Sequence, residues 1–150
     1  MDLFPNGGSY SLFTITYNLR RYTESGRKNG THRMKDSILL TKSKAFALRV
    51  VRLYKYLRER KESVIAKQML RSGTSIGANI AESRYAQSKS DFASKLQIAL
   101  KEAAETEYWL ELLRDSELVE SSSAFDSLCT DCTELIKLLT ASVKTAKENT

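Results

Sequence analysis

The chain has 150 residues, of which 41% are hydrophobic and 28% charged, and its formal net charge is +6. This length and composition predict one globular domain with one core. No apolar run approaches the roughly 18–20 residues of a membrane span, and no basic stretch followed by an apolar one marks a secretory signal. We therefore expect a cytoplasmic protein without membrane contact.

The charges are unevenly distributed along the chain. Residues 42–61 contain eight basic residues and one acid, whereas residues 101–120 contain seven acids and two basic residues. A basic segment suggests contact with nucleic acid, and opposite charges on one chain suggest head-to-tail self-association. Two solvated helix faces of opposite charge would give the same composition, so all three interpretations stay open.

Residues 1–33 differ from the rest of the chain. They contain the single proline, Pro5, and four of the six glycines, and they show no helical period. We expect a flexible extension here, followed by a helical domain over residues 34–150. An alternative is that translation starts at Met34.

The first predicted helix covers residues 40–60. Its core stripe follows the 3.6-residue period of an amphipathic helix and consists of Phe46, Val50, Leu53, Tyr54 and Leu57. On the far side, Arg49, Arg52 and Lys55 are spaced three residues apart. They predict a compact basic ridge, with Lys44 and Arg58 nearby.

The second predicted helix covers residues 63–85, with Ser63 as its N-cap. Gly73, Gly77 and Ala81 form a stripe of small residues at four-residue spacing. A glycine inside a helix costs roughly 1 kcal/mol relative to alanine, so we expect the stripe to let another helix approach closely. A large side chain at Gly77 should then disrupt the bundle or its assembly.

Two further helices are predicted, one from about residue 88 to 114 and one from 122 to 147. The third helix carries a heptad seam with alternating steps of four and three residues, made of Phe92, Leu96, Ala99, Ala103, Thr106, Leu110 and Leu113. Short links between four helices force antiparallel neighbours. The sequence therefore predicts an all-α, up-down-up-down four-helix bundle.

The third helix also has a second apolar face, where Glu102 and Glu105 share a stripe with Ile98, Trp109 and Leu112. One helix with two apolar faces requires two partners, the core of its own bundle and a further surface such as another subunit. We expect Arg71 of the second helix to pair with Glu102 or Glu105, within one subunit or between two.

The pentapeptide GTSIG, residues 73–77, fits the G-x-S-x-G pattern of the nucleophile elbow in serine hydrolases. Such chemistry at Ser75 requires a His base, which follows the Ser in that class, and a strand before the turn. The single His, His32, precedes the motif, and both flanks of the motif are helical. We therefore expect no catalytic residue.

Cys129 and Cys132 form a C-x-x-C pair inside the fourth predicted helix, without the strand that precedes a redox motif. A zinc site would need two more ligands, and the E-x-x-E pair of Glu102 and Glu105 has no helical His to complete a di-iron site. We expect reduced cysteines packed in the core, and no metal or cofactor.

Four stretches resemble one known family. They are FALRVVRLYKYL (46–57), LRSGTSIGANIAES (70–83), SKSDFASKLQIALKEAAETEYWLELL (88–113) and ELIKLLTASVKTAKE (134–148). From residue 34 to 147 the chain is similar to the four-helix-bundle proteins encoded in intervening sequences of 23S ribosomal RNA genes, whose members typically begin near Met34. The resemblance implies a ring-like homopentamer. It also implies kinship with the accessory protein of diversity-generating retroelements, a basic pentameric barrel that partners a reverse transcriptase and binds nucleic acid.

Three functions remain for such a protein. The first is a non-enzymatic homo-oligomer that binds RNA or DNA through the phosphate contacts of Lys44, Arg49, Arg52, Lys55 and Arg58. The second is a protein-interaction adaptor, such as an accessory subunit of a reverse transcriptase, whose basic ridge meets an acidic protein surface. The third, an enzyme with an unfamiliar site, has only the polar stripe around Ser75 to support it.

Overall fold

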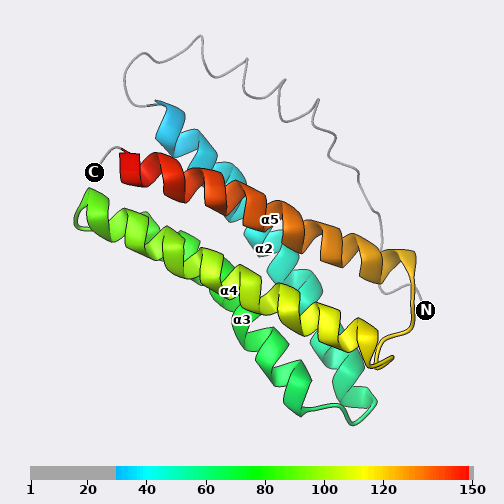
Figure 1. The fold of residues 1–150 in the computed structure, drawn as a ribbon. Coiled ribbons are helices and arrows are strands. Elements are labelled where there is room, and N and C mark those ends of the chain that lie inside the picture. The colour runs from blue at the N-terminus through cyan, green and yellow to red at the C-terminus, as the bar shows by residue number, and fades with distance from the viewer. Residues whose placement is uncertain (1–29, 149–150) are drawn as a thin grey trace.

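The computed structural model describes residues 30–148, with side chains from residue 38 onward. Four helices follow one another: α2 (Gly30–Glu59), α3 (Val64–Ser83), α4 (Lys89–Asp115) and α5 (Ser123–Glu148). Each helix contacts the next, and α2 also contacts α5, which closes the bundle (Figure 1). The predicted all-α, up-down-up-down bundle is confirmed. None of the described helices is both long and apolar enough to cross a membrane.

The core lies between the four helices, where each turns its apolar stripe inward. Its largest fully buried side chains are Phe46, Leu39, Leu57, Met69, Ile76, Ile80, Leu96, Leu110, Leu113, Leu128, Leu135 and Leu139. Four hydroxyl side chains are buried with them, those of Ser43, Ser72, Ser83 and Thr106. Two of these hydroxyls meet between helices: Thr106 Oγ1 of α4 lies 2.9 Å from Ser72 Oγ of α3 and 2.7 Å from the carbonyl of Glu102. Both hydroxyls therefore have hydrogen-bond partners inside the core, as buried polar groups require.

The heptad seam of α4 differs from the prediction at its first position. Ala93 is buried there, while Phe92 is only half-buried and packs against the edge of the core. Counting back from Leu96, a step of three reaches Ala93 and a step of four reaches Phe92. The alternating steps favour Phe92, but the packing of α4 on its neighbours buries Ala93 instead.

The start of α2 departs from the prediction, whereas Ser63 is the N-cap residue of α3 as predicted. α2 begins at Gly30 rather than near Leu40. The hydrophobic period missed this start because residues 31–37, THRMKDS, hold a single apolar residue and therefore no apolar stripe that could signal a helix. The predicted flexible extension therefore loses residues 30–33 to α2, and its remainder lies outside the described residues. At the start of α3, Ser63 holds the N-cap position without a side-chain capping bond, whereas Ser88 Oγ caps α4 by accepting the Asp91 N–H at 3.0 Å.

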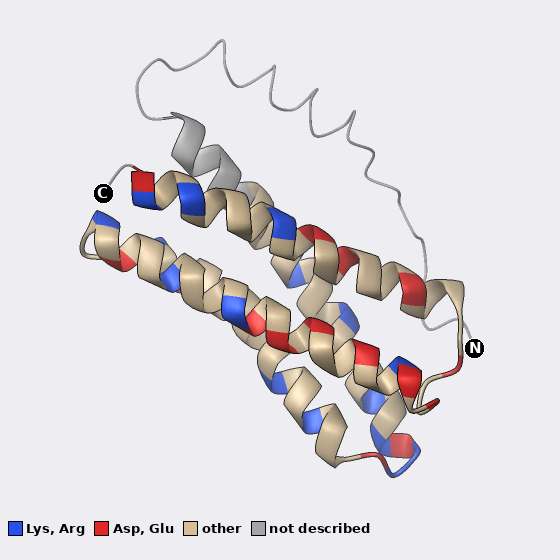
Figure 2. Ribbon diagram, viewed as in Figure 1, with Lys and Arg blue, Asp and Glu red and all other residues tan. Residues whose placement is uncertain are grey.

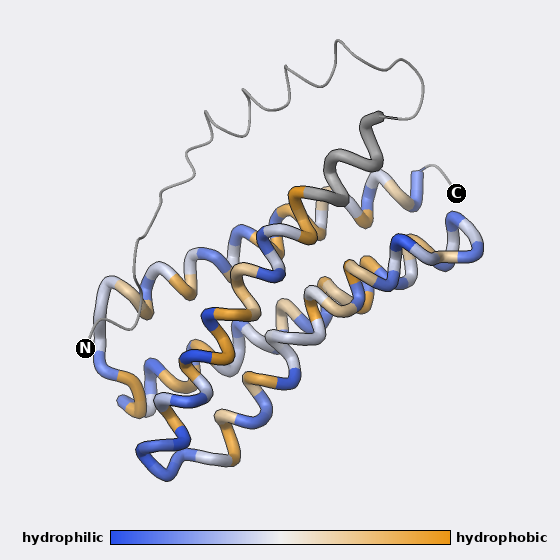
Figure 3. Tube along the Cα trace, turned by 180° about the vertical axis from the view of Figure 1, so that it is seen from behind, coloured by the Kyte–Doolittle hydropathy of each residue, from blue (hydrophilic) through white to orange (hydrophobic). Residues whose placement is uncertain are grey.

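The glycines of α3 face α2 of the same chain, which Figure 3 shows from the side of these two helices. A Cβ atom built on Gly73 would lie 2.9 Å from both methyl carbons of Val50, and one on Gly77 would lie 3.3 Å from Ser43 Oγ. The small-residue stripe therefore permits a close approach of α2, with Gly73 buried at its tightest point and Ala81 half-buried near its end.

Candidate nucleic-acid interface

The outward side of α2 is basic. Lys44, Arg52, Lys55 and Arg58 are all exposed, and Figure 2 shows Lys and Arg repeated along the second half of this helix. None of the four forms an ion pair with an acid among the residues whose side chains are described. Arg58 instead lies 5.9 Å from the ring centre of Tyr54 and donates to its hydroxyl at 3.4 Å. These side chains therefore leave a row of positive charges without an acidic partner in the bundle.

Arg49, which the spacing assigned to this ridge, faces α5 instead. Its guanidinium pairs with Asp131, donates to the carbonyl of Ala124 at 2.8 Å and reaches Ser127 Oγ at 3.3 Å. The side chain is 17% exposed. At about 100° per residue, Arg49 is turned about 60° from Arg52 around α2, which is enough to place it in the contact with α5.

A second ion pair lies in the same contact and was not predicted. Lys42 Nζ lies 3.0 Å from the carboxylate of Glu134. Lys42 and Arg49 are seven residues apart on α2, and their partners Glu134 and Asp131 are three apart on α5, so each pair of charges shares one helix face. That spacing is the signal in the sequence that indicates an ionic seam between two antiparallel helices.

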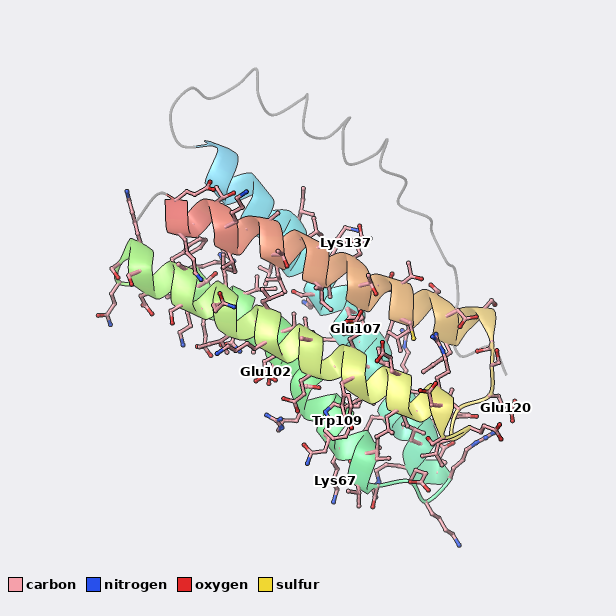
Figure 4. The ribbon with its side chains drawn as sticks, viewed as in Figure 1. Lys67, Glu102, Glu107, Trp109, Glu120 and Lys137 are labelled. Carbon is pink, nitrogen blue, oxygen red and sulfur yellow. The ribbon has the colours of Figure 1, made fainter. Side chains whose placement is uncertain are left out.

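On the opposite side of the bundle, α3 and α4 are joined by a polar cluster. Arg71 donates to Glu105 Oε1 at 2.5 Å, and Trp109 Nε1 donates to the same oxygen at 3.1 Å. Arg71 thus pairs with one of the two acids that the sequence offered. Glu102 lies one turn away with its Oε2 atom buried and without a hydrogen-bond partner among the described residues. Figure 4 shows Glu102 and Trp109 along the side of α4 that borders α3.

The second apolar line of α4 is incompletely covered. Ile98 is 39% exposed, and Trp109 and Leu112 are half-buried. Tyr108, beside Trp109, is 56% exposed and meets its ring edge-on at 5.1 Å between centres. A buried carboxylate oxygen without a donor and a partly exposed apolar line therefore lie on one helix face.

The residues considered for chemistry have ordinary helical surroundings. Ser75 lies in the middle of α3, and its carbonyl accepts a bond from the Asn79 amide at 2.9 Å. Cys132 is fully buried with its Sγ 3.5 Å from the carbonyl of Ala103, and burial raises its pKa to about 12. Burial also raises the pKa of Cys129. Both thiols are therefore protonated at neutral pH, and the described residues contain no group of three His, Cys, Asp or Glu placed to hold a metal.

The sequence pattern of the family described as 23S rRNA-intervening sequence protein matches residues 35–141. The chain belongs to this family. The match confirms the family named by the resemblance, whereas the kinship with retroelement accessory proteins stays a prediction.

A solved structure agrees with this assignment. It is a crystal structure of a protein with unknown function from the S23 ribosomal protein family of Bacteroides thetaiotaomicron VPI-5482. Its sequence is 55% identical to this chain, the match covers 73% of this chain and 98% of that one, and the TM-score is 0.70. A comparison with curated proteins found no match.

Proposed function

We propose that this member of the 23S rRNA-intervening sequence family is a cytoplasmic, non-enzymatic homo-oligomer that binds RNA through the outward side of α2. The observation that carries the proposal is the row of exposed cations without acidic partners, Lys44, Arg52, Lys55 and Arg58. Phosphate contacts of this kind supply affinity that does not depend on sequence and falls steeply with salt.

The outer face of α4 supports self-association. A carboxylate oxygen buried without a donor is costly, and Glu102 Oε2 gains a partner if a second copy covers this face. Ile98, 39% exposed one turn before Glu102, gives the same contact an apolar component. Five subunits, as the family resemblance implies, would repeat the basic side of α2 around a ring and multiply a weak phosphate contact through avidity.

Binding to a fluorescent RNA hairpin, titrated with NaCl, tests the nucleic-acid part of the proposal. We expect the wild type to bind with strong salt dependence and the triple variant Lys44/Arg52/Lys55→Glu to lose binding. The matched control, Lys101/Lys137/Lys144→Glu, makes the same change in net charge at exposed lysines on α4 and α5. It should retain most of the affinity. A wild type that binds neither RNA nor DNA at low salt rules the proposal out.

Native mass spectrometry tests the assembly. We expect one closed oligomer for the wild type and monomers for Ile98→Arg, which places a charge on the incompletely covered face of α4. The matched control is Ala45→Arg on the outward side of α2, which should assemble as the wild type does. A monomeric wild type would contradict this part of the proposal.

One observation favours a second candidate, a protein-interaction adaptor such as an accessory subunit of a reverse transcriptase. Leu48 is 54% exposed between Lys44 and Arg52. An apolar side chain among cations suits an acidic protein surface with an apolar spot better than it suits a phosphate backbone. A partner that remains bound after nuclease treatment, and that Leu48→Ala releases, would support the adaptor over the RNA-binding protein.

A further inference from the structure

Tyr85 is the most exposed large hydrophobic side chain among the described residues. It is 85% exposed in the turn that connects α3 to α4, compared with 56% for Tyr108 on α4. No described residue stacks on its ring or bonds its hydroxyl, so the whole aromatic face is open to solvent. An exposed tyrosine by itself requires no explanation, and its surroundings decide what it can do.

The backbone that carries Tyr85 is held in place on both sides. The N–H groups of Tyr85 and Ala86 donate to the carbonyls of Glu82 and Ser83 at 2.9 and 3.2 Å, which continue the last turn of α3. The far end of the turn is held by the Gln87 N–H, which donates to Asp91 Oδ2 at 3.0 Å. Tyr85 is therefore presented by a braced turn, and a ligand that stacks on it does not have to order the backbone first.

The charges around Tyr85 favour an anionic ligand. Arg84 and Lys89 are exposed on either side of it, and the nearest acids along the chain are Glu82 and Asp91, whose carboxylate accepts from the Gln87 N–H. The preceding acid, Glu82, pairs with Lys95 at 2.6 Å. Exposed Lys147 of α5 lies at the same end of the bundle, 3.1 Å from Gln97 of α4.

Tyr108 provides the opposite environment on the same protein. Glu105, Glu107 and Glu111 lie within one turn of it on α4, so a phosphate near this ring is repelled. The two most exposed tyrosines therefore differ in the sign of the charge around them, and only Tyr85 combines an open ring with flanking cations.

We infer that Tyr85 is a stacking platform for an unpaired base of the bound RNA, with Arg84 and Lys89 contacting the phosphates on either side of that base. The inference rests on the proposed function, and it adds that the RNA carries a single-stranded segment. Aromatic rings stack on every base without reading its sequence, and basic side chains beside them follow the backbone. Ser43 meets Gly77, and Tyr85 lies roughly 12 Å farther along the axis of α3, in the direction of the start of α2.

The test compares two fluorescent probes of equal length, an unpaired RNA and a blunt RNA duplex, with the full-length protein. The wild type should bind the unpaired RNA more tightly. Tyr85→Ala should weaken that binding about tenfold while leaving the duplex affinity unchanged, and Tyr85→Phe should retain it. In a UV cross-link with the unpaired RNA, the modified peptide should contain Tyr85. At 85% exposure, none of these changes affects the core.

Tyr108→Ala is the matched control, since it removes an exposed tyrosine from acidic surroundings, and it should change neither affinity. The inference is overturned if Tyr85→Ala binds the unpaired RNA as tightly as the wild type, or if Tyr108→Ala weakens it equally. If the inference fails in this way but Lys44/Arg52/Lys55→Glu still loses RNA binding, the proposed function is retained. A wild type that binds neither probe overturns both.

Discussion

The two contacts of α2 hold it in different ways. Toward α3, the contact depends on shape: Gly73 has no side chain where the methyl groups of Val50 lie, and Gly77 leaves room for Ser43. Toward α5, the contact is ionic, with Lys42 paired to Glu134 and Arg49 bonded to three groups of α5.

Because of this difference, the α2–α3 contact and the α2–α5 contact should respond differently to salt and to changes in side-chain size. Close packing is indifferent to ionic strength but sensitive to a single added carbon, because protein interiors are packed as densely as organic crystals. Ion pairs at the edge of a bundle tolerate changes of shape but weaken with salt, since charges in contact with solvent are screened. We therefore expect substitutions on the α3 side to show effects independent of salt, and those on the α5 side to show effects that salt reduces.

The largest effect should come from Gly73→Leu. A Cβ atom there already falls 2.9 Å from two carbons of Val50, so the rest of the leucine forces α2 and α3 apart at a cost of about 3 kcal/mol or more. Urea unfolding followed by circular dichroism measures it. Ala78→Leu, at an exposed position of α3, is the control and should change stability by less than about 0.5 kcal/mol. Equal stability of the two variants would show that the contact is not close at Gly73.

A smaller loss is expected for Arg49→Met, which keeps the aliphatic stem and removes the bonds to Asp131, Ser127 and Ala124. We expect about 1.5 kcal/mol, at the low end for bonds of a charged group because Asp131 is partly exposed. A double-mutant cycle with Asp131→Asn isolates the pair, and its coupling energy should fall at high salt. Arg52→Met, on the outward side of α2, is the control and should be nearly neutral. A coupling energy of zero at low salt would contradict the ionic account.

The Lys42–Glu134 pair should contribute less. Its two side chains are 22% and 41% exposed, and pairs of this kind contribute about 0.5 kcal/mol. A cycle of Lys42→Met and Glu134→Gln, measured by thermal unfolding at low and high salt, should give a coupling that disappears with added salt. A coupling energy as large as that of Arg49 with Asp131 would show that the number of hydrogen bonds does not decide which ion pair contributes more to stability.

The smallest net change is expected for Gly77→Ala. The added Cβ atom meets Ser43 Oγ at 3.3 Å, and a small displacement of this hydroxyl, which donates to the Leu40 carbonyl, relieves the contact. Alanine gains roughly 1 kcal/mol of helix propensity over glycine, so the two effects should offset to within about 0.5 kcal/mol. Urea unfolding of Gly77→Ala and of Gly73→Ala, compared with the wild type, measures how differently the two glycine positions respond in the free energy of unfolding. A loss above about 1.5 kcal/mol would mean that Gly77 is as tightly packed as Gly73.

Much of the bundle could be predicted from sequence, because the hydrophobic period records which side of each helix faces the core. The period failed where it had a single apolar residue to follow, at residues 31–37, and where two apolar residues were adjacent, at Phe92 and Ala93. Among the candidate site residues, Lys44, Arg52, Lys55 and Arg58 are exposed on α2 as their spacing indicates, while Arg49 is not. Tyr85 was missed because neither period nor motif marks a single aromatic residue in a short turn.

By itself, the sequence determined the fold class, the four helices, the resemblance to the 23S rRNA-intervening sequence family and the presence of small residues on one stripe of α3. These properties are local or periodic, so they can be read along one segment at a time. Only the tertiary structure decided that Gly73 meets Val50 more closely than Gly77 meets Ser43, and that Arg49 bonds α5 while Arg52 remains exposed. Those outcomes depend on the rotation and separation of helices distant in the chain, which few residues signal and which the packing of the whole core sets.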